Sequence, residues 1–248
     1  MTATNGTQRA PAISLSKVQE RAPDLVSLYK AAGDSIRGHE LEGVRAAVYL
    51  VLDRSGSMRP YYRDGTMQHL AEQVLSLSAH LDDDGIVPVV FFSTDVDGST
   101  DLALGGHRGR INKLHENLGH MGRTNYHWAM DEVIDHYTKS GRRSPALVIF
   151  QTDGGPTSKP AAERYLCKAA RLPLFWQFVG FGDPDSNEFT FLRKLDALAV
   201  PACRVVDNAG FFHAGRAPKA TADHRLFDQL LHEFPDWLAA ARTARIVQ

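Results

Sequence analysis

The feature that most constrains this sequence is an apolar run that ends in alternating polar residues. Residues 47–52 read Ala-Val-Tyr-Leu-Val-Leu, and Asp53, Ser55 and Ser57 follow at every second position. A short apolar run bounded by polar residues predicts a buried strand of a parallel sheet. Open α/β sheets bind ligands at the carboxyl ends of such strands. The loop that leaves this strand can turn one carboxylate and two hydroxyls toward one point, and these donors suit hard cations such as Mg2+.

Two later segments offer further oxygen ligands. Thr124 supplies a hydroxyl in a glycine-containing loop, residues 122–125, just before a helix-like stretch. A second apolar run, residues 146–152, again predicts a buried strand, and Asp153 and a glycine follow it. The three segments together predict a metal site whose ligands are Asp53, Ser55, Ser57, Thr124 and Asp153.

These segments, Asp-x-Ser-x-Ser, a loop Thr and a strand-end Asp-Gly, resemble the metal-ion-dependent adhesion site (MIDAS) of von Willebrand factor type A (vWA) domains. Residues 48–58, 118–126 and 208–212 are similar to the vWA module of bacterial tellurite-resistance (Ter) proteins. The resemblance implies a doubly wound, Rossmann-like α/β fold. Its sheet is expected to be six-stranded and mainly parallel, with one antiparallel edge strand and helices on both faces.

The resemblance also implies a function. In this family a carboxylate of a partner protein completes the shell of the bound cation, so we expect a metal-dependent protein-interaction module of a tellurite or chemical-stress response. The expected partners are other Ter-system proteins, and the expected ion is Mg2+, with Mn2+ or Ca2+ as alternatives. Polar and aromatic residues next to the ligand loops are expected to line the partner surface: Asn125, Tyr126, His127, Tyr61 and Tyr62. Arg54 and Arg123 are candidates for attracting an acidic partner.

Two other classes of function compete with this interpretation, namely an enzyme and a structural module. A Mg-dependent phosphatase or phosphotransferase of the haloacid dehalogenase kind needs a second Asp two residues after the first, where this chain has Ser55. A serine hydrolase needs Gly-x-Ser-x-Gly, and residues 54–57 lack the leading glycine. We therefore expect no enzyme. The other alternative, a metal-stabilised structural module without a metal-bridged partner, stays open.

Composition limits the remaining possibilities. With 248 residues and 43% hydrophobic content, the chain can bury one substantial core. A net charge of −1 gives no reason to expect direct nucleic-acid or membrane-surface binding through bulk charge. No segment reads as a signal peptide or membrane span, so a cytoplasmic protein is expected. The oligomeric state stays open.

The cysteines and histidines predict no further site. Cys167 and Cys203 lie far apart beside apolar residues, which favours burial as small hydrophobic side chains without a disulfide. The 11 histidines match none of the strong zinc spacings. His115 and His120 are expected on the surface of a helix or loop.

The chain divides into three expected parts. Residues 1–12 predict a disordered tail, residues 13–43 a helical extension, and residues 44–248 the vWA domain, which leaves no room for another domain before it. Within the domain, the patterns predict strands at about 46–52, 86–92, 101–104, 146–152, 174–179 and 204–206. They predict helices at about 67–81, 108–118, 126–140, 159–171, 189–198 and 224–242.

Overall fold

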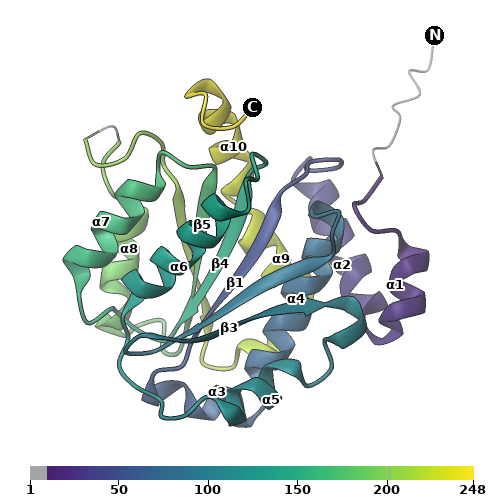
Figure 1. The fold of residues 1–248 in the computed structure, drawn as a ribbon, viewed down its shortest axis with the longest axis horizontal. Helices are drawn as coiled ribbons and strands as arrows, with labels where there is room; N and C mark the ends of the chain where they lie inside the picture. Colours follow the sequence, from purple (N-terminus) through teal and green to yellow (C-terminus); the bar gives the residue numbers. More distant parts are fainter. Residues whose placement is uncertain (1–9, 201) are drawn as a thin grey trace.

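One mixed sheet forms the centre of the computed structural model, which describes residues 10–200 and 202–248 (Figure 1). Its order is β3-β2-β1-β4-β5-β6, and only the β2–β3 pair at one edge is antiparallel. The predicted fold class is therefore confirmed. The strands are β1 (Ala47–Asp53), β2 (Ile86–Phe92), β3 (Val96–Ala103), β4 (Ala146–Thr152), β5 (Leu174–Phe181) and β6 (Ala209–Gly215).

Helices connect the strands and cover the sheet. In the described residues these are α1 (Leu15–Arg21), α2 (Val26–Gly38), α3 (Arg59–Arg63), α4 (Thr66–Leu81), α5 (Arg110–Asn117), α6 (Tyr126–Lys139), α7 (Lys159–Ala169), α8 (Thr190–Asp196), α9 (Asp223–Leu231) and α10 (Phe234–Thr243).

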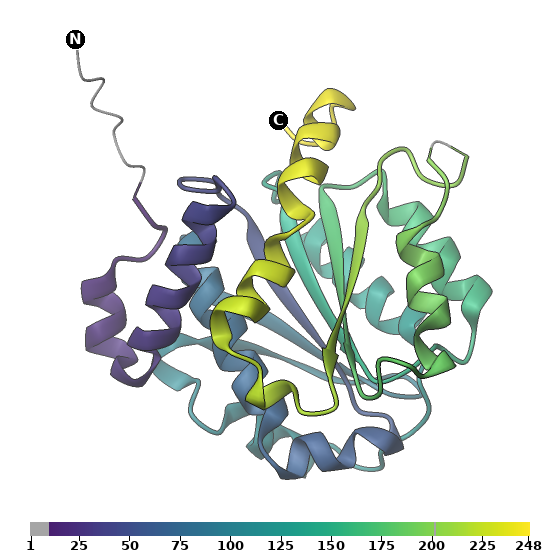
Figure 2. The same ribbon diagram turned by 180° about the vertical axis from the view of Figure 1, so that it is seen from behind.

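The sheet is buried on both faces, so the molecule has two apolar cores. Side chains alternate along a strand, and in β1 this places Leu50 and Leu52 in one core and Tyr49 and Val51 in the other. The first core includes buried residues of α2, α4, α9 and α10, and the second includes those of α6, α7 and α8. Figures 1 and 2 show these two helical layers from opposite sides. Burial on both faces explains why β1 and β4 read as continuous apolar runs.

The N-terminal helices pack on the domain. α2 contacts both α4 and α9. The Tyr29 hydroxyl donates to the carbonyl of Ile13 at 2.7 Å, and the His80 ring bonds to the Tyr29 carbonyl at 2.8 Å. Ala12 also donates its N–H to the His80 carbonyl at 3.2 Å. Most of the predicted tail, residues 1–9, lies outside the described residues, and the boundary of the extension at residue 43 stays a prediction.

The C-terminal part of the chain differs from the sequence prediction in two places. The strand predicted near residues 204–206 is wrong, because Arg204 there donates to the carbonyls of Asp196 and Leu198 and holds a loop. The last strand is β6, which follows this loop. The single helix predicted at 224–242 is two helices, α9 and α10, and Pro235 lies in the first turn of the second, where its missing N–H is tolerated.

Two other expectations about strand ends and cysteines need correction. The edge strand β3 begins at Val96, earlier than the predicted 101–104. Its residues 96–101 are partly or fully exposed and mostly polar, so they carry little apolar signal. The expected burial of both cysteines is wrong for Cys203, whose side chain is exposed, while Cys167 is only partly buried.

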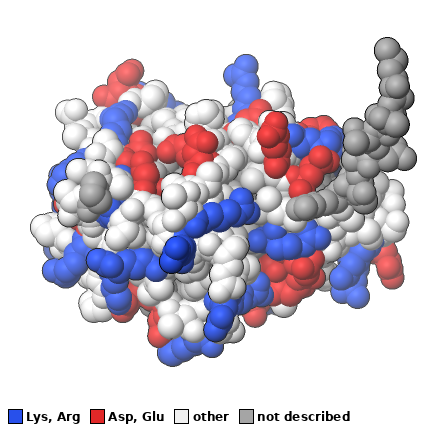
Figure 3. Space-filling view, turned by 90° about the horizontal axis from the view of Figure 1, so that it is seen from above, with Lys and Arg blue, Asp and Glu red and all other residues white. Residues whose placement is uncertain are grey.

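The face formed by the N-terminal ends of the central strands carries charges of both signs. Figure 3 shows Lys and Arg side chains in a band across this face, with acidic side chains on both sides of it. Ion pairs there join Arg142 to Asp82 and Asp84, and Arg45 to Asp83. The charges therefore compensate one another locally. The polar ligands predicted from the sequence lie at the opposite ends of the strands.

Replacement of a buried residue of α2 will test whether the N-terminal helices belong to the folding unit. Ile36 is 4% exposed and belongs to the first core. Ile36→Ala should lower the free energy of unfolding by about 2 to 5 kcal/mol, because it removes buried methyl groups and leaves a cavity. Urea unfolding followed by circular dichroism measures the change. The exposed Lys30→Ala in the same helix should stay within about 0.5 kcal/mol of the wild type, and an equally small effect of Ile36→Ala would show that the extension folds independently.

Candidate metal site

Asp53 lies at the end of β1 and is fully buried, with 0% exposure. Its Oδ1 accepts the N–H of Ser55 at 2.6 Å, and its Oδ2 accepts the Thr152 hydroxyl at 2.6 Å. Thr152 ends β4, the strand paired with β1. Among the described residues no ion pair includes Asp53, so only neutral donors of Ser55 and Thr152 stabilise its charge within hydrogen-bond distance.

The second carboxylate and two hydroxyls lie beside it. Asp153 follows β4 directly, and β1 and β4 are the neighbouring strands at which the order of the doubly wound sheet changes direction. Such a switch point opens a crevice at the carboxyl ends of the strands. The hydroxyls of Ser55 and Ser57 lie 3.2 Å apart, and both form hydrogen bonds that favour the charged form of Asp153.

Backbone hydrogen bonds bring the Thr124 loop to the same place. The N–H of Gly56 donates to the carbonyl of Gly122 at 3.1 Å, and the N–H of Thr157 donates to the carbonyl of Thr124 at 2.7 Å. The loop is therefore joined to both Asp-bearing loops. Gly122 is required for this approach, because a Cβ at this position would lie 2.3 Å from the Thr94 hydroxyl and 3.1 Å from the Thr94 backbone nitrogen.

The electrostatics of the cluster favour a cation. Burial, and secondly repulsion from Asp153, raise the pKa of Asp53 to about 7. Burial also raises the pKa of Asp153 above its usual value. Both shifts mean that the folded protein provides too little positive charge for two neighbouring carboxylates. The two carboxylates and the hydroxyls of Ser55 and Ser57 offer oxygen atoms alone, which fits a hard divalent cation.

The ligand set contains few charged groups. Within residues 10–200 and 202–248, no group of three or more His, Cys, Asp or Glu is placed to hold a metal ion. A cation at this site would therefore depend on the serine and threonine hydroxyls as well as on Asp53 and Asp153. Such a set suits Mg2+ or Mn2+ better than a cation that requires nitrogen or sulfur ligands.

Comparison with known proteins agrees with this geometry. A family model described as the vWA domain found at the C terminus of TerF matches residues 45–247. The chain belongs to this TerF-like vWA family. The uncharacterized protein YcbR of Bacillus subtilis (strain 168) is 34% identical over 213 residues, which cover 84% of each chain.

Two solved structures show the same fold as this vWA domain. The crystal structure of manganese-loaded TRAP protein from Plasmodium vivax is 23% identical, with a TM-score of 0.51, and the match covers 77% of this chain and 73% of that one. Proximal thread matrix protein 1 of the mussel byssus is 15% identical, with a TM-score of 0.50 over 79% of this chain and 47% of its own. At these identities the likeness concerns the fold.

A buried arginine supports the ligand loops of the vWA domain, and the sequence analysis did not identify this role. The Arg54 side chain is 1% exposed and therefore cannot attract a partner. Its guanidinium forms an ion pair with Asp97 at 2.7 Å and donates to the carbonyls of Leu118 and Gly119. It thereby fixes the end of β1 to β3 and to the segment that leads to Thr124. The sequence pattern did not indicate this role for Arg54. Polar residues alternate after the apolar run, and an Arg between two ligand positions is expected to point to solvent.

His115 also belongs to this support. Its ring stacks on Tyr62 with centroids 3.9 Å apart and accepts a hydrogen bond from Arg54 Nε at 3.2 Å. Burial, and secondly the nearby Arg54, lower the pKa of His115, which keeps the ring neutral and able to accept this bond. His115 is partly exposed on α5, so its predicted place on a helix surface holds, but its contacts with Arg54 and Tyr62 were not predicted.

Two of the five residues predicted to line a partner surface are buried. Tyr62 is 4% exposed and donates its hydroxyl to the Asp53 carbonyl at 3.1 Å. Tyr126 is 0% exposed and donates to the carbonyl of Gly154, beside Asp153. Both side chains position ligand loops and do not form a docking surface. Tyr61, Asn125 and His127 are partly exposed and stay candidates.

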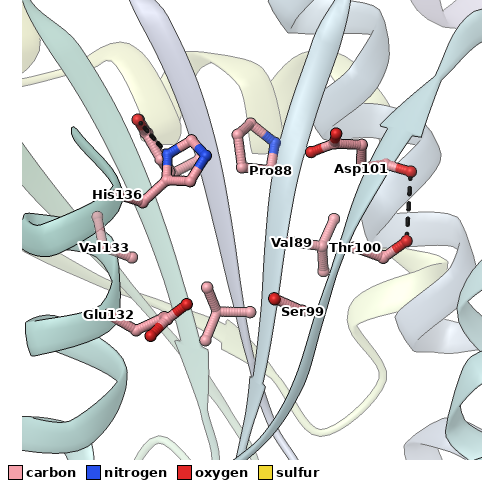
Figure 4. Close-up of a pocket in the computed structure, with 10 residues that line it drawn as sticks. Pro88, Val89, Ser99, Thr100, Asp101, Glu132, Val133 and His136 are labelled. Atoms are coloured by element: carbon pink, nitrogen blue, oxygen red, sulfur yellow. Dashed lines mark hydrogen bonds between the residues drawn. The ribbon is translucent and has the colours of Figure 1, made fainter. Parts of the chain in front are cut away.

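Two of the cavities in the described structure bear on the predicted site. One of about 200 Å³ lies between α6 and strands β2 and β3 (Figure 4), and none of the predicted metal ligands lines it. Its one side-chain pair in hydrogen-bond contact is His136 with the Tyr49 hydroxyl, at 3.0 Å. The other, of about 440 Å³, lies between α3 and α5 and is lined by Arg59, Arg63, Tyr62 and His115 among others. This second cavity shares Tyr62 and His115 with the side chains that support the loops of the candidate metal site.

Removal of the Arg54 guanidinium should strongly destabilise the vWA domain. Arg54→Gln leaves Asp97 and two loop carbonyls without their buried donor, and loss of one partner of a buried ion pair costs about 3 to 5 kcal/mol. Urea unfolding measures the loss. Arg59→Gln, at an exposed position in the same region, is the matched control and should change stability by less than about 0.5 kcal/mol. Equal effects of the two substitutions would contradict the assigned role.

The metal-free domain should become less stable as the pH rises through neutrality. Because the folded state raises the pKa of Asp53 from 3.8 to about 7, it holds this proton more tightly than the unfolded chain does. The resulting stabilisation is complete below the unfolded pKa and is lost as the pH rises through about 7. Asp53→Asn, which has no such charge, should therefore melt at a higher temperature than the wild type at pH 8 in EDTA, with a smaller difference at pH 5.

A second carboxyl provides the control for this pH series. Burial raises the pKa of Glu233 to about 7 as well, far from the metal site. Glu233→Gln should remove an independent contribution to the pH profile over the same pH range, and its effect should not change when Mg2+ replaces EDTA. An Asp53→Asn protein with the full wild-type pH dependence would show that Asp53 does not carry the effect.

Proposed function

We propose that this domain binds a divalent cation and, through it, a carboxylate of a partner protein. The ligands in this proposal are Asp53, Ser55, Ser57, Thr124 and Asp153. The observation that carries it is the fully buried Asp53 carboxylate, which forms no ion pair with any residue that the structure describes and lies beside a second carboxylate and two hydroxyls. A structural role alone would be served at lower energetic cost by neutral residues, since burial of an uncompensated charge is unfavourable.

The composition of the site favours an added anion. Two carboxylates neutralise a divalent charge formally, but their charge is spread over oxygens that also accept hydrogen bonds from Ser55, Ser57 and Thr152. Mg2+ demands six oxygen ligands and usually keeps open or water-filled positions in such sites. A partner's Asp or Glu can take one of them. Mg2+ is the favoured ion, and the manganese in the related TRAP structure supports Mn2+ as an alternative.

The surroundings favour an acidic partner. Arg59 and Arg63 are exposed and line the cavity of about 440 Å³ between α3 and α5, next to Tyr62. An acidic side chain of the partner that lies beside the metal-bound carboxylate can pair with one of these guanidinium groups. The TerF-like family assignment supports partners from a Ter-type chemical-stress response in the cytoplasm. None of the described helices has the length and apolar character needed to cross a membrane.

The serines favour ligand roles over catalysis. Their hydroxyls contact each other and Asp153. Across the described residues, no histidine forms a hydrogen bond with Ser55 or Ser57 that would activate either as a nucleophile. We therefore place a binding function ahead of hydrolysis or phosphoryl transfer.

Calorimetric titration of the metal-stripped protein with Mg2+, Mn2+ and Ca2+ tests the cation site. The wild type should bind at one site per chain, whereas Asp53→Ala and Thr124→Val should lose most of the binding heat. Ser99→Ala, on the edge strand away from the ligand loops, is the matched control and should bind as the wild type does. Binding by Asp53→Ala equal to that of the wild type would exclude the proposed ligand set.

Affinity capture of partners in Mg2+ and in EDTA separates the proposed function from the structural alternative. A partner that is retained by the wild type in Mg2+, released by EDTA and not retained by Asp53→Ala supports a metal-bridged carboxylate. Substitution of the partner's interface Asp or Glu by the corresponding amide should then abolish binding. Metal-dependent melting without any metal-dependent association would favour the structural alternative.

A further inference from the structure

A cavity of about 270 Å³ lies between helix α10 and the N-terminal ends of β5 and β6 (Figure 2). The proposed metal ligands follow the opposite, C-terminal ends of β1 and β4, so the cavity lies apart from them. Two aromatic rings and three carboxyl groups are among the side chains that line it: Phe175, Trp237, Asp207, Glu233 and Asp236. Its walls therefore combine apolar surface with negative charge.

Two oxygen atoms beside this cavity lack a hydrogen-bond donor. A Cβ at Gly210 would lie 2.6 Å from Glu233 Oε1 and 2.9 Å from Gln177 Oε1, so the glycine leaves room for both oxygens at one place. Gln177 is 1% exposed, and within residues 10–200 and 202–248 its Oε1 has no partner. The Glu233 carboxylate forms no ion pair or side-chain hydrogen bond with those residues. Buried acceptors are normally satisfied, so a donor from a ligand fits between them.

The aromatic rings suit a donor that carries a positive charge. The centroids of Phe175 and Trp237 are 5.6 Å apart, and Phe234 stacks on Trp237 at 5.5 Å. Trp237 is 3% exposed and therefore fixed in place, and its Nε1 has no acceptor among the residues that the structure describes. The faces of such rings attract ammonium groups and also pack against methylene groups.

The charges around the cavity are mainly negative. Asp207 pairs with Arg204 at 2.7 Å, whereas Glu233 and the exposed Asp236 form no ion pair in the described part of the chain. Burial, and then repulsion from Asp196 and Asp207, raise the pKa of Glu233 to about 7. No three of the described His, Cys, Asp and Glu residues are placed to hold a metal ion. An organic cation therefore suits the cavity better than a metal ion does.

We propose that this cavity binds the primary ammonium group of an aliphatic amine. The nitrogen lies between Glu233 Oε1 and Gln177 Oε1 and donates a hydrogen bond to each, which uses two of its three donors. The methylene groups pack against Phe175 and Trp237. In a diamine the second ammonium group extends toward the exposed Asp236 at the rim. This site does not depend on the proposed metal-binding function.

Titration of the full chain with n-butylammonium chloride at pH 8, followed by 1H–15N spectra, tests the proposal. The chain has three tryptophans, and the indole N–H signal of Trp237 is the one that is missing from Trp237→Phe. This signal should shift and saturate in the millimolar range, while the signals of Trp128 and Trp176 stay in place. Neutral n-butanol, which has the same length, should bind at least about tenfold more weakly, since it cannot pair with a carboxylate.

Three variants connect the binding to the proposed contacts. Glu233→Gln keeps the shape of the side chain and removes its charge, so it should lower the affinity for n-butylammonium roughly tenfold or more. Gln177→Leu removes the second acceptor and should weaken binding several-fold. Glu20→Gln, at an exposed position of α1, is the matched control and should bind as the wild type does. Melting curves show that each variant is folded.

Binding should also tighten as the pH rises. The Glu233 carboxyl is neutral below its pKa of about 7 and charged above it, whereas the alkylammonium group stays charged, so affinity should rise roughly tenfold between pH 6 and pH 8. Four other charged groups act on Glu233: Asp196 of α8, Arg204 and Asp207 of the following loop, and Asp236 of α10. The pKa of Asp196 is raised to about 6, so its ionisation adds to the lower part of this range. Glu233→Gln should lose most of the pH dependence.

Putrescine and Nα-acetyl-lysine amide distinguish two sources of the ammonium group. Tighter binding of putrescine supports a free diamine as the ligand, and tighter binding of the lysine derivative supports a lysine side chain of another protein.

Three results would overturn the proposal. One is an unchanged Trp237 signal at saturating amine, which would show that Glu233 and Gln177 satisfy each other, through a proton on Glu233 or a reversed amide. The others are equal affinities for n-butylammonium and n-butanol, and wild-type affinity in Glu233→Gln.

Discussion

The buried carboxylate of Asp53 is the constraint on which the site depends. A charge at the end of an apolar strand is costly in the absence of a counter-charge, and the fold keeps it in place by surrounding it with hydrogen bonds from Ser55 and Thr152. These bonds reduce the unfavourable free energy of the buried charge but do not remove it, as the raised pKa of Asp53 indicates. A cation at this position would therefore be favoured electrostatically. The unfavourable free energy of the Asp53 charge comes mainly from burial, and the same burial explains the apolar sequence of β1.

The support of the ligand loops is built from residues with no direct access to a partner. Arg54 joins the end of β1 to β3 and to the segment before Thr124, and Tyr62 and Tyr126 reach the carbonyls of Asp53 and Gly154. Loops that carry ligands on different elements must be held in a fixed relation for a cation to bind them together. In this domain one buried guanidinium and two buried phenols hold the loops in place. Arg54 and Tyr126 lie within two residues of a proposed ligand, and Tyr62 bonds to the carbonyl of Asp53.

The sequence predicted the fold class and the strands that end at the candidate metal ligands, because two-sided burial makes β1 and β4 continuous apolar runs. It failed where packing decides the outcome. Residues 204–206 contain two valines and read as a strand, but the Arg204 side chain turns them into a loop. Tyr62 and Tyr126 read as polar surface residues, yet both are buried, and each donates its hydroxyl to a carbonyl from another part of the chain. Such long-range partners leave no local signal in the sequence.

Helix α7 ties the loops of the candidate metal site to the second core. Its N-terminal end follows the Asp153 loop, where the N–H of Thr157 donates to the carbonyl of Thr124. Its buried residues, such as Ala162 and Leu166, lie in the second core, so the helix cannot shift at one end without disturbing that packing. The Asp153 and Thr124 loops are therefore held in relation to each other by the packing of the second core, whereas Arg54 joins the end of β1 to β3. The positions of the candidate ligands depend on both supports at once, which is why neither of them is visible in the sequence around the ligands.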